Sequence, residues 1–171
     1  MEFKRISREN GQWNTLWQQW DKECTKYGET ISDYATSALS TLKPLAEDPQ
    51  ITSAGVYGLI DKDEIVAVCQ LNVTGLPGYT GPVVRLRHLV LAPKFDFDDS
   101  TTIQEYINVL SSVFAGTINL AHSEMKADHA KLHFRSPADK EFFKNIEQSL
   151  KSNSVFSHVA LKGSWLYVSI K

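Results

Sequence analysis

The spacing of apolar residues changes along the chain, and this change limits the folds that the sequence can adopt. In the first third, apolar side chains recur every three or four positions, which predicts two amphipathic helices, at about 13–27 and 32–45. Further on the pattern alternates: the β-branched runs 54–60 and 65–73 flank a charged turn, which predicts a β-hairpin. A chain with both periods must build a mixed α/β fold.

The first predicted helix carries three tryptophans on its apolar stripe, Trp13, Trp17 and Trp20. Because each indole ring buries a large apolar area, we favour packing in the core over a ligand site. Gly28 is a plausible end of this helix, and Pro49 closes the segment that holds the second one.

The middle of the chain predicts a long strand followed by a helix. The strand covers 83–91 and ends at Pro93, because proline cannot donate to a strand ladder. The helix begins at Ser100 or Thr101 and ends near Gly116, and Thr102 with Glu105 has the spacing of a capping box.

The last third predicts a strand at 130–134, a helix beginning with Ser136-Pro137, and a closing hairpin of strands 155–161 and 165–170. With a short strand at 1–6, the predicted order is β-α-α-β-β-β-α-β-α-β-β. The 171 residues match the size of one domain, so we expect a single domain over 1–171.

Charge and composition exclude several classes of protein. The net charge is -2 and the lysines and arginines are scattered, so we expect neither a nucleic-acid nor a membrane partner. The N-terminus has no apolar run typical of a signal peptide, which predicts a cytoplasmic protein. Cys24 and Cys69 lack partner spacing and are expected to be buried, reduced thiols.

The order of elements resembles the GNAT superfamily of acyl-CoA-dependent N-acyltransferases over nearly the whole chain. The local likeness is the run Leu89-Val90-Leu91-Ala92-Pro93, where a central strand reaches a proline before the acyl-CoA loop. The resemblance implies a mixed, mostly antiparallel sheet of about seven strands flanked by four helices. It also implies acetyl-CoA or another acyl-CoA as cosubstrate, with the backbone of Leu89, Val90 and Leu91 on its pantetheine arm.

The segment after Pro93, residues 94–99, departs from the family's glycine-rich phosphate loop. Asp96 stands about where the family has a basic residue, and Asp99 about where it has the first glycine. Carboxylates near a helix N-terminus stabilise the helix, which explains Asp98 and Asp99 without a ligand. They would also repel a pyrophosphate, so acyl-CoA binds weakly, or Lys94 and other cations compensate, or the site has another ligand.

His88 is the candidate catalytic base, because a neutral imidazole can deprotonate an ammonium group near neutral pH. It lies where many members of the family carry an acidic base. The alternative is a structural, hydrogen-bonded histidine. Strand alternation places Val84, Leu86, His88 and Val90 on one face and Arg85, Arg87, Leu89 and Leu91 on the other.

Other polar residues carry weaker hypotheses. The family's tyrosine acid is replaced by Phe142 and Phe143, with three possible substitutes, Tyr79, Tyr106 and Tyr167. The group of His122, Glu124, Asp128, His129 and His133 matches no compact zinc pattern, so we expect no metal. Arg85 and Arg87 form a charged outer face or pair with a phosphate or carboxylate ligand.

Three functions remain open from the sequence. The first is an N-acetyltransferase that moves an acyl group to an amine of a small molecule or a protein. The alternative is a non-catalytic domain that has lost the acyl-CoA phosphate loop. The third is a structural subunit of a homo-oligomer, for example a homodimer, with the tryptophan-bearing helix at the interface.

Overall fold

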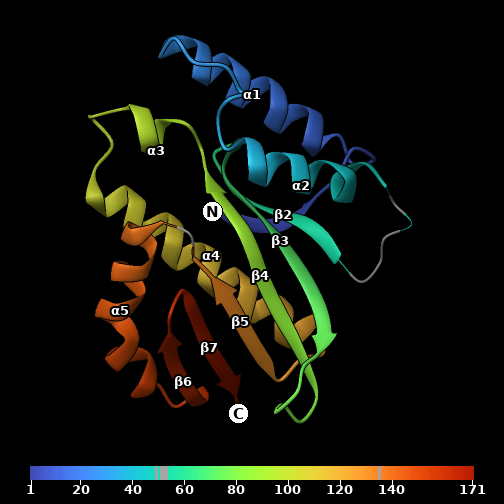
Figure 1. The fold of residues 1–171 in the computed structure, drawn as a ribbon, viewed down its shortest axis with the longest axis vertical. Helices are drawn as coiled ribbons and strands as arrows, with labels where there is room; N and C mark the ends of the chain where they lie inside the picture. The colour runs from blue at the N-terminus through green and yellow to red at the C-terminus, as the bar shows by residue number, and fades with distance from the viewer. Residues whose placement is uncertain (49, 51–53, 135) are drawn as a thin grey trace.

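The computed structural model describes residues 1–48, 50, 54–134 and 136–171, which form seven strands and five helices (Figure 1). In chain order these are β1 (Glu2–Ile6), α1 (Gln12–Lys26), α2 (Thr36–Glu47), β2 (Ala54–Asp61), β3 (Glu64–Gly75), β4 (Pro82–Leu91), α3 (Lys94–Phe97), α4 (Ile103–Ser123), β5 (His129–His133), α5 (Pro137–Lys151), β6 (Phe156–Lys162) and β7 (Trp165–Ile170). The predicted order is confirmed, with α3 as an additional four-residue helix. Pro49, predicted to close the second helical segment, lies outside the described residues.

All seven strands join one sheet in the order β1-β2-β3-β4-β5-β7-β6. Every neighbouring pair is antiparallel except β4 and β5, which run parallel. The predicted hairpin of β2 and β3 turns through Lys62 and Asp63, which have φ values of 47° and 70°. Positive φ at both central residues is the geometry of a type I′ turn, whose twist suits a two-residue hairpin.

Helices cover the sheet from both sides (Figure 1). On one side, α1 and α2 pack on the first four strands and enclose a core that includes Ile6, Val56, Val68 and Val90. On the other side, the main core joins α4 and α5 to all strands from β2 to β7. Helix α1, which carries the three tryptophans, belongs to the α1–α2 core. Trp13 and Trp20 are buried there, and the Trp20 Nε1–H donates to the Ile65 carbonyl at 2.7 Å. The prediction of core tryptophans is confirmed for these two.

Helix α4 differs from its prediction at both ends. It begins at Ile103, and Thr102 with Glu105 forms the predicted capping box. It continues past Gly116 to Ser123, so the prediction that Gly116 ends it was wrong. A Cβ at position 116 would lie 2.5 Å from the Phe3 side chain, which means that this glycine lets α4 approach β1 closely.

Strand β4 contains a β-bulge at His88 and Leu89, which lie together opposite Cys69 of β3. His88 has a φ of 53°, a left-handed value that is uncommon for residues other than glycine. The extra residue inverts the alternation, so Val90 packs with the α1–α2 core while Leu89 and Leu91 pack against the main core. The predicted faces were therefore wrong beyond Arg87, because a bulge leaves no trace in the spacing of apolar residues.

Candidate functional site

The parallel strands β4 and β5 pair only along the first half of β4. Their register runs from Val83 opposite His129 to Leu86 opposite Leu132. Beyond this point β4 continues to Leu91 and keeps only β3 as a neighbour within the described residues. One edge of its last residues is thus left without a partner strand, with backbone donors and acceptors turned toward it.

A cavity of about 570 Å³ lies at this open edge. Leu89, Val90 and Leu91 of β4 contribute to its wall. The other lining residues come from the α1–α2 connection and α2, from the α3 region, from α4 and from the start of α5: Glu29, Asp33, Tyr34, Ala35, Ser37, Ala38, Asp96, Phe97, Tyr106, Ser136 and Asp139. Five parts of the fold therefore meet where β4 and β5 diverge.

Tyr34 holds one wall of the cavity against the open edge. Its hydroxyl donates to the Leu91 carbonyl at 2.8 Å, and its ring meets Trp20 edge-on at 6.2 Å. The Ala92 amide donates to the Val66 carbonyl of β3. Because backbone groups alternate in direction along a strand, those of Leu91 and Leu89 face the open edge. Burial, and then the charge of Asp96, raise the pKa of Tyr34, which keeps this hydroxyl protonated as a donor.

A buried pair, Tyr106 and Asp139, joins α4 to α5 at the cavity. The Tyr106 hydroxyl donates to Asp139 Oδ1 at 2.5 Å, and Asp139 is only 6% exposed. Asp139 lies in the first turn of α5, where Ser136 is the N-cap and accepts from the Ala138 and Asp139 amides. Burial raises the pKa of Asp139, although hydrogen bonds from Tyr106 and Ser136 oppose it.

We expect Asp139→Asn to change how stability depends on pH. With its pKa raised, Asp139 binds a proton more tightly in the folded chain, so its stabilising contribution is full below the unfolded pKa and is lost as pH rises through the folded pKa. The amide of asparagine can still accept from Tyr106 but does not titrate. In urea unfolding between pH 4 and pH 8, the free energy of unfolding of the variant should rise relative to that of the wild type as pH rises.

The control for this experiment is Asp21→Asn, which removes an exposed carboxylate on α1. It removes one negative charge outside the Tyr106–Asp139 pair and so controls for the change in net charge. A loss of stability in Asp139→Asn that grows with pH would contradict the assigned direction.

The cavity carries an acidic lining. Glu29, Asp33, Asp96 and Asp139 contribute carboxyl groups, and no lysine or arginine is among the described residues that line it. Negative charges that line a cleft raise the local concentration of cations and lower that of anions. A protonated amine therefore fits this cavity better than a phosphate does.

The β4–α4 loop uses its own oxygens to satisfy its backbone amides. Asp98 Oδ1 accepts from the Ser100 amide at 2.9 Å, and Glu105 accepts from the Thr102 amide at 2.8 Å. Amides at seven positions of this segment donate within the chain: 95, 96, 97, 98, 100, 101 and 102. An anion that sought these amides would have to displace the bonds already made.

Of the carboxylates expected near the start of α4, Glu105 of the predicted capping box lies in its first turn, whereas Asp98 does not. Because α4 begins at Ile103, Asp98 ends α3 instead of preceding α4, and the acidic residue in the first turn is Glu105. The Thr102 amide lowers the pKa of Glu105, and the Ser100 hydroxyl lowers that of Asp98, so both groups stay charged at neutral pH. The acidic character predicted for this loop is present, and the predicted capping box of Thr102 and Glu105 begins the helix.

The predicted site residues are only partly brought together. Leu89, Val90 and Leu91 line the cavity, whereas His88, buried at the bulge, is not among the described lining residues. Lys94 faces Glu64 at 3.9 Å. Among the three candidate acids, Tyr106 lines the cavity and Tyr79 lies against His129, 5.0 Å between ring centroids.

Sequence reasoning missed Tyr34, Asp96 and Asp139 as cavity residues. The local signal at Asp139 was the helix start Ser136-Pro137, which also explains an acidic residue there, so nothing marked it for a buried role. Only its contact with Tyr106, distant in the sequence, distinguishes it.

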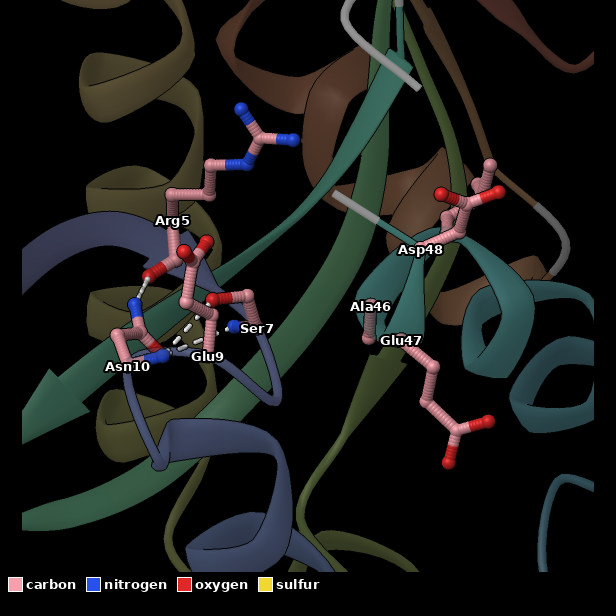
Figure 2. A pocket seen from close by; sticks show the side chains of 8 residues that line it. Arg5, Ser7, Glu9, Asn10, Ala46, Glu47 and Asp48 are labelled. Carbon is pink, nitrogen blue, oxygen red and sulfur yellow. Dashed lines mark hydrogen bonds between the residues drawn. The ribbon is translucent and has the colours of Figure 1, made fainter. Parts of the chain in front are cut away.

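A second cavity, of about 330 Å³, lies between the β1–α1 turn and the end of α2 (Figure 2). Figure 2 shows Asn10 turned back on its own loop, where Oδ1 accepts from Ser7 at 3.0 Å and Nδ2 donates to Arg5 at 2.9 Å. Its polar groups thus hold the turn together, and we do not assign it a ligand.

Neither a group of metal ligands nor a membrane-spanning helix is found in the described part of the chain. No three His, Cys, Asp or Glu side chains lie there so as to hold a metal ion. His129 instead contacts the Ser169 hydroxyl at 2.8 Å, and His133 packs on Trp165. Within the same residues, no helix has the length and apolar character needed to cross a membrane.

Comparison with known proteins gives structural likeness alone. No family model and no curated protein matches the sequence. Among solved structures, the N-acetyltransferase PseH of Campylobacter jejuni matches 99% of this chain with 96% of its own, at 16% identity and a TM-score of 0.52. The GNAT domain of S. lividans PAT matches 97% with 87%, at 10% identity and 0.52, and a probable acetyltransferase matches 96% with 99%, at 15% and 0.51. The chain has the fold of the GNAT superfamily.

Proposed function

We propose that this GNAT-fold domain transfers an acyl group from acetyl-CoA or another acyl-CoA to an amine acceptor. The observation that carries the proposal is the open edge of β4 beside a cavity of about 570 Å³. An edge with free backbone groups suits the amide-bearing pantetheine arm, as a β-strand suits an added peptide. The carboxylates of the cavity suit the amine.

In this proposal the backbone of Leu89 binds the thioester arm, together with Leu91 once Tyr34 releases its carbonyl, while Val90, whose backbone faces β3, only contributes to the cavity wall. The amine first loses a proton to His88, directly or through water. Its nitrogen then attacks the thioester carbonyl, the C–N bond forms, the C–S bond breaks, and the thiolate leaves and takes up a proton. Holding the amine against the thioester supplies much of the acceleration.

The β4–α4 loop limits the affinity for the cosubstrate. Asp98 and Glu105 are charged, and the neighbouring amides already have partners. A pyrophosphate brought near these two carboxylates meets like charge and is repelled. We therefore expect dissociation constants for acetyl-CoA toward the millimolar range, with most of the binding energy on the pantetheine arm.

The test combines binding and turnover. Calorimetric titration with acetyl-CoA should show saturable binding, and thiol release should appear with at least one amine of a broad panel. His88→Asn removes the base but tolerates the left-handed backbone, so it should lower turnover by about 100-fold and leave acetyl-CoA binding unchanged. Unchanged turnover would remove His88 as the base.

The second candidate is a non-catalytic domain that binds a cationic ligand. The observation that favours it is the same loop, whose amides bond within the chain, above a cavity lined by carboxylates. Absence of acetyl-CoA binding at several millimolar, together with binding of a free amine such as cadaverine, would support this candidate over the transferase.

A further inference from the structure

One part of the sheet is not covered by α1 and α2. These helices pack on β2, β3 and β4, whereas on the same side no helix of the described residues lies over the outward residues of β5, β7 and β6 (Figure 1). We call this surface the cationic face and define it by Arg85, Arg87, Lys131, Lys162, Trp165 and Tyr167. Its strand positions follow from the register of β3 to β7.

The residues of the cationic face form neighbouring cross-strand rows. Arg85 lies opposite Lys131, which in turn lies opposite Tyr167. The Lys131 ammonium sits 4.2 Å from the Trp165 ring centroid and 4.8 Å from that of Tyr167. The Arg85 guanidinium lies 5.6 Å from the Trp165 ring. All three distances lie within the range of cation–π attraction.

Carboxylates do not neutralise this face. In the described part of the chain, no salt bridge joins Arg85, Arg87, Lys131 or Lys162 to an acidic residue. The outward positions of β3, β4, β5, β7 and β6 in these rows hold no aspartate or glutamate. The Arg85 Nε is moreover buried without a hydrogen-bond partner. A chain with a net charge of -2 has therefore left several cations unpaired on one surface.

We propose that the cationic face binds the oxyanion group, a carboxylate or a phosphate, of the amine acceptor. The inference rests on the proposed function and names its substrate class: an amine that also carries an acidic group. Arginine suits this task because its planar guanidinium can bond both oxygens of a carboxylate or phosphate at once.

The position of the face relative to the cavity supports this substrate class. Arg87 and Val90 lie on the same side of β4, and Val90 lines the acidic cavity. Because of the bulge, Arg87 and Val90 lie opposite Gln70 and Val68, which are two residues apart on β3, so about 7 Å of strand separates them, a distance that an amino-acid-sized molecule can span. An acceptor with its acid on the arginines would therefore direct its amine toward the cavity carboxylates and the open edge of β4.

The alternative occupant is single-stranded nucleic acid, which binds cations interleaved with aromatic rings. Two observations favour the small acceptor. Lys131 already covers the faces of Trp165 and Tyr167, so bases would have to displace it to stack. The carboxylates of the adjoining cavity would also repel a long phosphate chain.

The experiment uses the indole signals of the full chain in two-dimensional NMR, without acyl-CoA. Trp165 reports on the cationic face, while Trp13, Trp17 and Trp20, all on α1, serve as internal controls. Titration with O-phosphoserine and with glutamate should shift the Trp165 signal saturably. Cadaverine, which has no acidic group, and a 15-residue deoxythymidine strand should not do so at equal concentration.

Two independent variants sharpen the test. Arg87→Gln and Lys131→Gln should each weaken binding of the acidic amines about tenfold or more, and Lys22→Gln on α1 should leave it unchanged. Unshifted α1 indoles would show that each variant is folded. The proposal would be overturned if both face variants bound the acidic amines as tightly as the wild type does. A Trp165 signal that responds only to the oligonucleotide would overturn it as well.

This design separates the failure of the inference from failure of the transferase. If the protein binds the acidic amines but transfers no acyl group, the oxyanion site is supported and the proposed reaction is rejected. Acyl transfer to amines that lack an acidic group, with no Trp165 shift, would retain the reaction and reject the site.

Discussion

Replacement of Trp20 by alanine is expected to lower the free energy of unfolding by about 3–5 kcal/mol. Trp20 is fully buried in the α1–α2 core, and its Nε1–H donates to the Ile65 carbonyl at 2.7 Å. The variant loses the apolar contacts of the indole and leaves a cavity next to Tyr34, whose ring meets Trp20 edge-on. Urea unfolding measured by circular dichroism gives the change directly.

Two controls separate the parts of this effect. Trp17→Ala removes a half-buried ring from the same helix and should cost clearly less. Trp20→Phe keeps a ring but loses the donor, and because Gln19 also donates to the Ile65 carbonyl, the cost should lie near 1 kcal/mol. A Trp20→Ala variant that loses less than Trp17→Ala would contradict the assigned core position.

The double variant Asp98→Asn and Glu105→Gln is expected to bind acetyl-CoA about tenfold more tightly than the wild type. Both substitutions keep oxygen acceptors for Ser100 and Thr102 but remove two negative charges, one at the end of α3 and one in the first turn of α4. Removal of two like charges lowers the electrostatic repulsion that a bound pyrophosphate meets, although solvent screens these exposed groups. Calorimetric titration at low ionic strength measures the gain.

The control for the loop variant is Glu141→Gln, an exposed carboxylate on α5. It should leave the affinity unchanged, and raising the salt concentration should reduce the advantage of the double variant. If acetyl-CoA binds the wild type and the double variant equally well, the acidic loop does not set the affinity.

The two surfaces that carry the proposals have opposite charge and meet along β4. The cavity presents Glu29, Asp33, Asp96 and Asp139, and the cationic face presents arginine and lysine on neighbouring strands. This separation of charge is hidden in a net charge of -2. It is the reason that we propose a substrate with both an amine and an acid instead of a simple amine.

The sequence by itself determined the elements and their order. Apolar periods of two and of three to four residues depend on local geometry, so the hairpin of β2 and β3, the tryptophan stripe of α1 and the capping box at Thr102 were all predictable. The same local information determined that no glycine lies between Pro93 and Thr102, and hence that the loop departs from the family's pattern.

Only the tertiary structure decided where these elements meet. The bulge at His88 inverts the faces of β4, Gly116 serves the approach of Phe3, and Tyr106 reaches Asp139 across 33 positions of the chain. The cavity and the cationic face likewise arise from strands and helices far apart in sequence. Such contacts depend on register and packing between distant segments, which the periodicity of any one segment does not encode.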